Sequence, residues 1–311
     1  MKVVRTDAEL ELPRVDQRLR DFGATLVLVE GAVSEDALAA ALRDADLLLM
    51  CYTRISEHVI SGAERLKGIV KYGVGIDAID IDAARRRRIP VVNVPEYAEA
   101  TVAEGAVALL LALAKKMKPL QHEMDTRGWA WPTGRWLATD LAGKTVGLVG
   151  VGRIGANVAR MLGLGFRMRV LGFDPNVDRE TMTRLGVEAC DNLHAMLALC
   201  DVVSVHAVLT PGTRHLLGER ELACMKPGAL LVNVSRGELV DEAALLSALQ
   251  GGRIAGAALD AYGDEPLARE GHRLSPLYAM DNVVLWPHLT FHTAEAMRRL
   301  EDETLERCFE V

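Results

Sequence analysis

The stretch that decides the fold reads Val146-Gly147-Leu148-Val149-Gly150-Val151-Gly152-Arg153-Ile154-Gly155. An apolar strand leads into the pattern G-x-G-x-x-G, formed by Gly150, Gly152 and Gly155. The first glycine allows a tight turn, the second lets the backbone approach a pyrophosphate, and the third lets the next helix pack on the strand. The N-terminus of the helix predicted over 153–162 offers free N–H groups to that pyrophosphate. The pattern indicates a dinucleotide-binding domain.

The following strand supports this interpretation over a plain glycine-rich turn. It is predicted over 168–173 and ends at Asp174, which lies 19 residues after Gly155 (174 − 155). A carboxylate about 20 residues beyond the motif is the expected partner of the ribose hydroxyls. Asp174 would repel a 2′-phosphate, and no arginine follows it directly in Pro175-Asn176-Val177. The sequence therefore favours NAD over NADP.

Outward from this motif, short apolar runs alternate with amphipathic helical segments, which is the pattern of parallel α/β architecture. A chain of 311 residues favours two domains. Helices are predicted over 34–43, over 101–117 with Pro119 as its boundary, and over 293–310 with Thr293 as N-cap. An irregular segment after the second helix holds Trp129, Trp131 and Trp136. Strands are predicted at 25–29, 47–50, 69–72, 91–94, 145–149, 168–173, 202–205, 229–234, 254–260 and 283–285.

Composition excludes several classes of function. The formal net charge of −7 disfavours nucleic acid as a partner, because phosphate binding needs a basic surface. The one dense basic run, Arg85–Arg88, is expected to be a solvated helix end. The N-terminus shows no secretory signal, the apolar run 106–114 is too short to span a membrane, and the five cysteines lie far apart. We therefore expect a cytoplasmic protein without a metal site, with a small molecule as its partner.

Three ionisable residues each follow a predicted strand of the same domain. They are Arg236, Glu265 and His288, which come after the strands at 229–234, 254–260 and 283–285. Ligands bind at the carboxyl ends of strands in open α/β sheets, so these side chains are expected to share one crevice. Taken singly, each also has a structural explanation. Arg236 could form a salt bridge, Glu265 could be a turn residue, and His288 could be a core histidine.

Together these side chains suit the chemistry of a 2-oxo acid. A planar guanidinium can hold a carboxylate and the adjacent carbonyl oxygen. Hydride arriving at C2 leaves negative charge on that oxygen, so a proton donor that titrates near neutrality is needed. An imidazole fills this role, and a neighbouring carboxylate would orient the ring and favour its protonated form. The sequence predicts an oxidoreductase that transfers hydride between NAD(H) and a small 2-oxo or 2-hydroxy acid.

The same motifs carry a resemblance to a known family. The chain resembles the D-isomer-specific 2-hydroxyacid dehydrogenases, which include the phosphoglycerate, glycerate/hydroxypyruvate and D-lactate dehydrogenases. The match runs from about Leu47 to His288 and includes, besides the glycine motif, Lys71-Tyr72-Gly73-Val74-Gly75-Ile76-Asp77, Thr101-Val102-Ala103-Glu104, His206-Ala207-Val208-Leu209-Thr210-Pro211, Asn233-Val234-Ser235-Arg236-Gly237 and Pro287-His288. Specificity for the D isomer is implied by this resemblance alone.

The resemblance implies a role for each matching residue. Arg236 would bind substrate and assist catalysis, Glu265 would pair with His288, and His288 would be the acid/base. Backbone N–H groups of the substrate loop, formed by Tyr72, Gly73, Val74 and Gly75, would bind the substrate carboxylate. Contacts to NAD would come from Gly150, Gly152, Arg153, Ile154, Gly155, Asp174, His206, Val234, Ser235 and Asp260, with Asp260 near the nicotinamide amide.

The resemblance also implies the domain organisation. It predicts two Rossmann-like or flavodoxin-like domains, with an NAD-binding domain at 100–285 inserted into a substrate domain formed by 1–99 and 286–311. Substrate and cofactor would be held by different domains, so closure about hinges near 98–101 and 285–290 is expected. Family members form two-fold dimers through the region of the tryptophan segment, so a homodimer is expected.

Other functions were weighed against this one. His288 and His292 have the spacing of metal ligands on a helix, but Pro287 and the Thr293 cap place them before the helix. A hydrolase would need a motif such as G-x-S-x-G, which is lacking. Formate-oxidising relatives carry glutamine at the position of Glu265, so the glutamate in this chain argues against formate oxidation. A non-enzymatic, NAD-sensing regulator of the C-terminal-binding-protein type shares the fold, and the intact trio argues for an enzyme instead.

Two departures from the family pattern leave the substrate open. Leu289-Thr290-Phe291-His292 is bulkier than the small residues that often follow this histidine, and is more like D-lactate-type enzymes. Relatives that bind phosphoglycerate place arginines around Met50–Thr53, where this chain has Met50-Cys51-Tyr52-Thr53 and then Arg54. The sequence therefore predicts the reaction class and does not name the acid.

Overall fold

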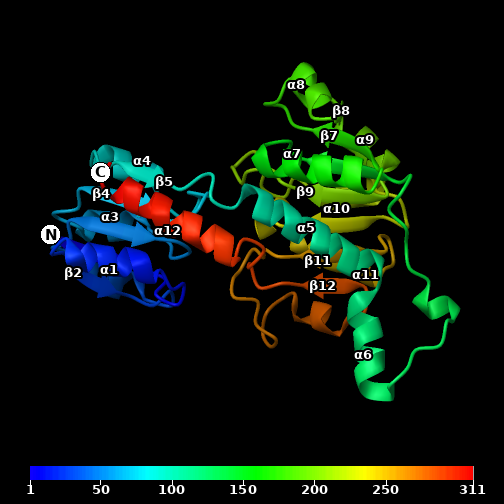
Figure 1. The fold of residues 1–311 in the computed structure, drawn as a ribbon, viewed down its shortest axis with the longest axis horizontal. Coiled ribbons are helices and arrows are strands. Elements are labelled where there is room, and N and C mark those ends of the chain that lie inside the picture. The colour runs from blue at the N-terminus through cyan, green and yellow to red at the C-terminus, as the bar shows by residue number, and fades with distance from the viewer. Residues whose placement is uncertain (311) are drawn as a thin grey trace. The chain divides into compact units, whose positions relative to one another are not determined.

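The computed structural model describes residues 1–310 and divides them into two compact units (Figure 1). The first unit contains Met1–Ala98 and the C-terminal segment that begins at His292, and the second contains Glu99–Phe291. Each unit is built on a parallel sheet, which confirms the predicted α/β class. Among residues 1–310, none of the helices combines the length and apolar character that crossing a bilayer requires.

The first unit is a five-stranded sheet with strand order β2-β1-β3-β4-β5, the order of flavodoxin-like folds. Its strands are β1 (Lys2–Arg5), β2 (Thr25–Leu28), β3 (Leu47–Met50), β4 (Gly68–Lys71) and β5 (Val91–Asn93). Its helices are α1 (Pro13–Asp21), α2 (Glu35–Leu42), α3 (Glu57–Gly62), α4 (Ile81–Arg86) and α12 (Ala294–Cys308). Buried strand residues such as Val4, Leu48 and Ile69 pack with α2, α3 and α4 in one core.

The second unit is a seven-stranded sheet with strand order β12-β11-β10-β9-β6-β7-β8, a Rossmann order extended by one strand. Its strands are β6 (Thr145–Val149), β7 (Arg169–Phe173), β8 (Glu188–Ala189), β9 (Val202–Val205), β10 (Leu230–Asn233), β11 (Gly256–Leu259) and β12 (Val283–Leu285). Its helices are α5 (Glu99–Ala114), α6 (Met117–Arg127), α7 (Arg153–Arg160), α8 (Arg179–Arg184), α9 (Leu193–Leu199), α10 (Glu219–Cys224) and α11 (Glu242–Gln250).

Both faces of this second sheet are covered by helices (Figure 1). Val202 and Val232 belong to a core shared with α5 and α7. Their neighbours Val203 and Leu231 belong to a second core, shared with α9, α10 and α11. Strands buried on both faces are apolar at most positions, which explains the nearly continuous apolar runs in the sequence. The strand order reverses between β6 and β9, so the carboxyl ends of these strands form the ligand-binding edge.

Two strands were not predicted, and one predicted helix differs from the structure. Strand β1 includes Lys2 and Arg5 and gives only a short apolar signal, and β8 has only two residues. The helix predicted over 101–117 ends earlier, at Ala114, and Lys116 then adopts a left-handed φ of 53°. Pro119 does not bound this helix. It lies in the first turn of α6, where a residue without an N–H loses no helical hydrogen bond.

The boundary predicted at 285 also differs from the observed division. Residues 286–291 belong to the second unit. The reason is local: the N–H groups of Leu289 and Thr290 donate to the carboxylate of Asp260, which directly follows β11. The chain therefore leaves the second unit only after Phe291.

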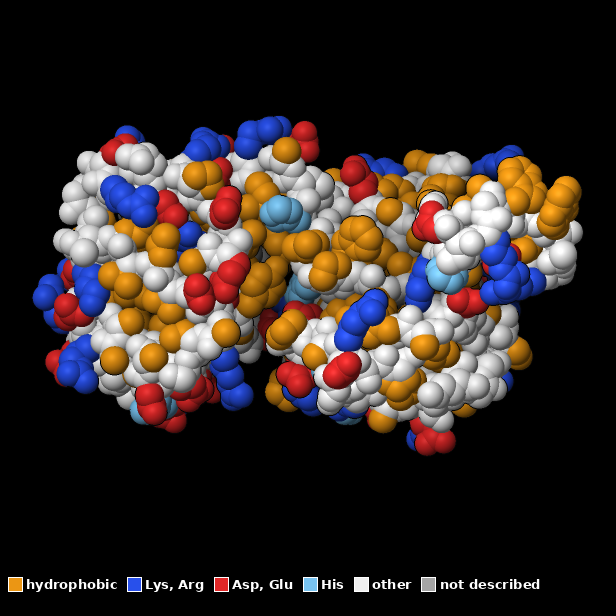
Figure 2. All heavy atoms as spheres, turned by 90° about the horizontal axis from the view of Figure 1, so that it is seen from below, with side chains coloured by type: hydrophobic (Ala, Val, Ile, Leu, Met, Phe, Trp, Pro, Cys, Tyr) orange, Lys and Arg blue, Asp and Glu red, His pale blue; other side chains and the backbone are white. Residues whose placement is uncertain are grey.

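The tryptophan segment is irregular, as predicted, except for a short 3-10 turn at Gly134–Trp136. It exposes large apolar side chains: Trp131 is 74% exposed and Leu137 is 75% exposed. Trp129 and, on the preceding helix, Met117 and Met124 are exposed as well. Figure 2 shows hydrophobic side chains at the surface of the second unit, towards the right-hand end of the view.

Candidate active site and dinucleotide site

The glycine loop between β6 and α7 has no room for side chains at two of its three glycines. Gly150 has a φ of 95°, and a Cβ there would lie 2.6 Å from the backbone nitrogen of Ala207. A Cβ on Gly155 would lie 2.4 Å from the carbonyl oxygen of Gly150. Gly152 instead faces open space and caps α7 without any side-chain hydrogen bond. The N-terminus of α7 is therefore open to an external acceptor on the side of Gly152, an arrangement that fits a pyrophosphate.

Asp174 lies at the end of β7 beside this loop. Its Oδ2 accepts a hydrogen bond of 2.9 Å from the N–H of Val151, and its Oδ1 accepts one of 2.9 Å from the N–H of Asn176. The carboxylate is half-buried, and each oxygen keeps a second lone pair. Asp174 therefore fixes the glycine loop and retains the capacity to accept from a ribose hydroxyl.

The remaining predicted cofactor residues lie at the carboxyl ends of neighbouring strands. Arg153 and Ile154 open α7, and the Arg153 guanidinium lies 3.1 Å from the Glu99 carboxylate. Val234 and Ser235 follow β10, and the Ser235 hydroxyl donates to the carbonyl of Val205 at 3.1 Å. Arg153 and Ile154 lie at the switch point between β6 and β9, and Val234 and Ser235 lie one strand away, after β10.

His206 follows β9 and packs against the glycine loop. Its Nε2 lies 2.8 Å from the Ser204 hydroxyl, while its buried Nδ1 has no hydrogen-bond partner among residues 1–310. Burial lowers the pKa of His206 to about 4. The ring is therefore neutral at physiological pH and contributes packing and polarity, not charge.

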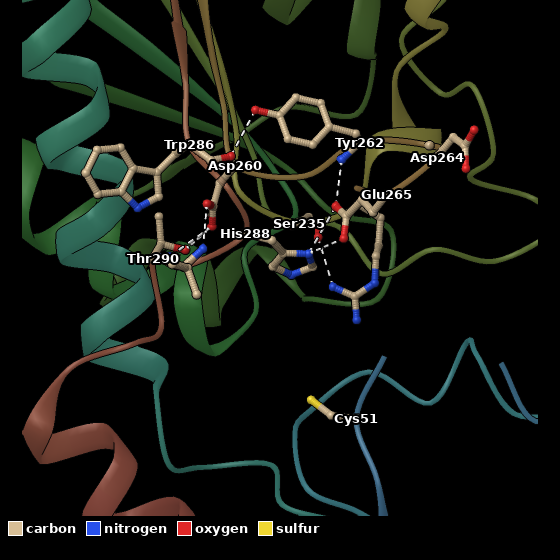
Figure 3. Close-up of polar contacts among 12 residues, drawn as sticks. Cys51, Ser235, Asp260, Tyr262, Asp264, Glu265, Trp286, His288 and Thr290 are labelled. Carbon is tan, nitrogen blue, oxygen red and sulfur yellow. Dashed lines mark hydrogen bonds and ion pairs between the residues drawn. The ribbon is translucent and has the colours of Figure 1, made fainter. Parts of the chain in front are cut away.

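The centre of the candidate active site is a histidine–glutamate pair (Figure 3). The Nδ1 atom of His288 lies 2.9 Å from Oε2 and 3.1 Å from Oε1 of Glu265. The N–H of Tyr262 donates to Oε1 of the same carboxylate at 2.9 Å, which sets its orientation. The side chains of His288 and Glu265 remain 22% and 30% exposed, so a ligand can reach them.

Arg236 completes the predicted trio on the adjacent strand end. It follows β10, its guanidinium donates to the carbonyl of Ser235 at 2.9 Å, and its own carbonyl accepts from the Asn233 side chain at 2.8 Å. Strands β10, β11 and β12 are neighbours in the sheet. Arg236, Glu265 and His288 therefore follow three successive strands at one edge, as the sequence predicted.

The substrate loop lies in the first unit, directly after β4. Tyr72 is fully buried, and both of its donors are used: its hydroxyl donates to the carbonyl of Thr6, and its N–H donates to the carbonyl of Met50 at 3.0 Å. The N–H of Gly73 donates to the carbonyl of Lys71 at 2.9 Å. Within residues 1–310, the N–H groups of Val74 and Gly75 donate no hydrogen bond, which leaves them as the loop's candidate donors. The loop thus contributes backbone, and the side chain of Tyr72 is structural.

Several residues that shape the site were not singled out from the sequence. Tyr262 orients Glu265 and also donates through its hydroxyl to the carbonyl of Trp286 at 2.9 Å. Gly237 is required because a Cβ there would lie 2.0 Å from the backbone of Tyr262. Thr290 is buried and donates to Asp260, which was predicted only as a cofactor contact. Of these residues, Gly237 was the one that stood within a quoted motif, directly after Arg236.

Metal ligation has no visible basis in the described part of the chain. Residues 1–310 contain no group of three or more His, Cys, Asp or Glu side chains placed to hold a metal ion. His288, one of the two histidines with helical ligand spacing, bonds to Glu265 and precedes α12.

Comparisons with known proteins agree with this geometry. Residues 107–290, more than half of the chain, match the family described as D-isomer specific 2-hydroxyacid dehydrogenase, NAD binding domain. A D-3-phosphoglycerate dehydrogenase from Methanocaldococcus jannaschii is 37% identical over 273 residues, covering 88% of this chain and 51% of that protein. The chain thus spans about half the length of the curated relatives it matches.

Two solved structures match over almost their whole length. D-lactate dehydrogenase from Aquifex aeolicus, complexed with NAD and lactic acid, is 32% identical with a TM-score of 0.88, covering 99% of this chain and 94% of that one. An acyclic imino acid reductase (Bsp5), in complex with NADPH and D-Arg, is 28% identical with a TM-score of 0.87, covering 100% and 96%. The similar proteins therefore act on chemically different substrates.

Proposed function

The chain belongs to the D-isomer specific 2-hydroxyacid dehydrogenase family, and on this premise we propose that it interconverts a small 2-oxo acid and its D-2-hydroxy acid with NAD(H). The observation that carries the proposal is the contact of 2.9 Å between His288 Nδ1 and Glu265 Oε2, beside the strand end that holds Arg236. A co-repressor that only senses NAD has no need of this acid/base pair, so that alternative is not favoured.

In the proposed mechanism, each member of the trio has its own task. Arg236 binds the substrate carboxylate and the carbonyl oxygen, because a guanidinium presents parallel donors to both. His288 protonates that oxygen as the alkoxide develops, and we assign the transfer to Nε2 because Nδ1 is committed to Glu265. Glu265 keeps the ring oriented and favours its charged form. The bound cofactor supplies or accepts the hydride.

We propose further that the substrate loop binds the acid group through the N–H groups of Val74 and Gly75, neither of which donates a hydrogen bond within residues 1–310. The preference for NAD over NADP is assigned to Asp174, whose carboxylate would repel a 2′-phosphate. Arg153, Ile154, His206, Val234, Ser235 and Asp260 are assigned to the same cofactor site.

Oligomerisation is the third part of the proposal. The segment 117–137 exposes two methionines, two tryptophans and Leu137, which is unusual for a surface that stays in contact with water. We propose that a second copy of the chain covers it in a two-fold homodimer.

One assay tests the central proposal. The purified chain is offered a panel of 2-oxo acids with NADH or NADPH, and cofactor oxidation is followed by absorbance. We expect turnover of at least one acid, faster with NADH, and a loss of kcat on the order of 10²–10⁴-fold in His288→Ala. Arg236→Ala should also raise KM, because the guanidinium contacts the ground-state carboxylate. No turnover across the panel, or full activity in His288→Ala, would contradict the proposal.

A further inference from the structure

The loop that carries His288 is held in a conformation that its own sequence does not favour. His288 has a φ of 58°, in the left-handed region that residues with a side chain rarely occupy. Such a conformation persists only where the surroundings determine it. Glu265 contacts the ring, but a side-chain contact does not by itself fix the backbone. The loop must therefore be anchored elsewhere.

The anchor is the carboxylate of Asp260 (Figure 3). Its Oδ1 accepts a hydrogen bond of 2.9 Å from the N–H of Leu289. Its Oδ2 accepts two hydrogen bonds from Thr290, one of 3.1 Å from the N–H and one of 2.5 Å from the hydroxyl. Asp260 is completely buried, so no water competes for these positions. The two residues after His288 are thus tied to the end of β11.

Thr290 is fixed from its other side by α5. A Cβ added to Gly105 would lie 2.6 Å from Cβ and 2.7 Å from Cγ2 of Thr290. The Thr290 side chain therefore fits against α5 only because residue 105 is a glycine. Thr290 is buried, and its hydroxyl has one acceptor to face. The threonine therefore connects helix α5, the buried carboxylate and the backbone that follows His288.

We propose that Thr290 and Asp260 are positioning residues for His288, with the threonine hydroxyl locking the carboxylate that holds the loop. This inference rests on the acid/base role proposed for His288. Neither residue needs to touch the reacting atoms. Their effect is to keep the imidazole aligned with Glu265 while a proton is transferred, and a displacement of about 1 Å can cost on the order of 10²-fold in rate.

Burial and hydrogen bonding act in opposite directions on Asp260. Burial raises the pKa of Asp260, while the hydrogen bonds from Thr290 and the charge of His288 oppose that rise. Removing the hydroxyl takes away a bond that favours the ionised carboxylate. The loop would then lose its anchor more readily as the pH falls.

The test uses Thr290→Val, which keeps the shape and removes the hydroxyl, and Thr290→Ser, which keeps the hydroxyl. Thr304→Val is the matched control, because Thr304 is fully buried and its hydroxyl has no hydrogen-bond partner among residues 1–310. Two readouts are needed: the NMR titration midpoint of the His288 ring, assigned with His288→Ala, and the pH dependence of kcat with the best 2-oxo acid.

We expect Thr290→Val to lower the titration midpoint of the ring and to reduce kcat by about tenfold or more, with KM changed by less than about threefold. Thr290→Ser should restore both values, and Thr304→Val should leave both unchanged. If Thr290→Val behaves like Thr304→Val, the hydroxyl has no positioning role and the proposal is wrong.

A measurement on the unaltered chain covers the case in which Thr290→Val does not fold. The amide hydrogens of Leu289 and Thr290 should exchange as slowly as those of β12, because both donate to a buried carboxylate. Rapid exchange would overturn the proposal. If no 2-oxo acid is turned over, the proposed function fails, whereas the titration and exchange data still decide whether Thr290 positions His288.

Discussion

At the scale of single residues, the hydrogen-bond partners in the site are often residues that lie far apart in the sequence. Glu265 illustrates this, because it receives the N–H of Tyr262 on one oxygen and contacts the His288 ring with both. The negative charge of the Glu265 carboxylate therefore lies directly beside the imidazole. Replacing the charge while keeping the shape is therefore the most direct test of the pair.

Glu265→Gln should keep measurable activity and move the pH–rate profile. The carboxylate favours imidazolium, so its loss makes the ring give up its proton at a lower pH. Reduction needs the protonated ring, so its rate falls as the pH rises. In Glu265→Gln this fall should begin at a lower pH than in the unaltered chain. The profile of kcat against pH measures this shift, and an unmoved profile would show that another group is the acid.

His206 predicts how stability depends on pH. Its folded-state pKa of about 4 lies below the ordinary value of 6.5, so the unfolded chain binds more protons between these values. The free energy of unfolding should therefore fall as the pH drops from 6.5 towards 4, by up to about 1.4 kcal/mol per pH unit for this group.

Denaturant unfolding between pH 4.5 and 7 tests this prediction. The slope of stability against pH should be smaller in His206→Asn than in the unaltered chain, because the variant lacks the titrating ring. His122→Asn, which changes an exposed histidine on α6, serves as the control and should keep the slope. Equal slopes in all three proteins would mean that His206 does not resist protonation in the fold.

Sequence reasoning singled out the trio because each residue lies within six residues of the end of an apolar strand. It did not assign the anchoring role of Asp260, which was expected only as a cofactor contact, because hydrogen bonds to residues 289 and 290 depend on the path of a loop. The first unit contains a comparable buried carboxylate, Asp7, which accepts from the N–H groups of Cys51, Tyr52 and Thr53. That residue was not predicted either, since a single aspartate after a short strand carries no pattern.

At the scale of elements, the loops after β10 and β11 pack backbone against backbone. Gly237→Ala should destabilise the fold, because its Cβ would lie 2.0 Å from the carbonyl carbon of Tyr262 and 2.1 Å from the nitrogen of Gly263. Overpacking of this kind costs about 1–3 kcal/mol or more. Chemical denaturation measures the loss. The matched control is Gly228→Ala, where a Cβ meets no atom within 4 Å, and equal stability of the two variants would contradict the prediction.

Element boundaries were predictable where caps and apolar runs coincide. Thr293 caps α12, as predicted, and the helix predicted over 34–43 is α2, with Ser34 as its N-cap. The break between α5 and α6 was missed because Ala, Leu, Lys and Met all favour helix, so nothing in their propensities marks a turn. The left-handed Lys116 is a tertiary outcome, and Pro119 was wrongly taken for the end of the first helix.

At the scale of the whole molecule, the predicted α/β class is confirmed in both units, and their strand orders follow two known schemes. These orders could not be derived from the apolar runs, since every internal strand of the second sheet is similarly apolar. The order came instead from the resemblance. The homodimer is likewise proposed from the exposed apolar side chains of the segment 117–137, not from the apolar runs of the strands.

The homodimer predicts a mass in solution of twice the chain. Light scattering at micromolar concentration should give the dimer, and replacing both Trp129 and Trp131 by serine should shift it towards monomer, since their exposed rings would lose their partner surface. Leu164→Ser, which removes an apolar side chain of similar exposure elsewhere in the second unit, should leave the dimer intact. A monomeric unaltered chain would contradict the proposal.

The first unit is formed by two separate segments of the sequence, which affects the order in which the two units can fold. Its last helix, α12, packs with α1, and the Glu301 carboxylate accepts the N–H of Arg14 at 2.7 Å across 287 positions of sequence. Leu300 on the same helix is fully buried. On the ribosome, the 1–98 segment emerges first but lacks this helix until residues 294–308 follow. The first unit can therefore be completed only after the second unit has been synthesised, so the second unit can fold earlier.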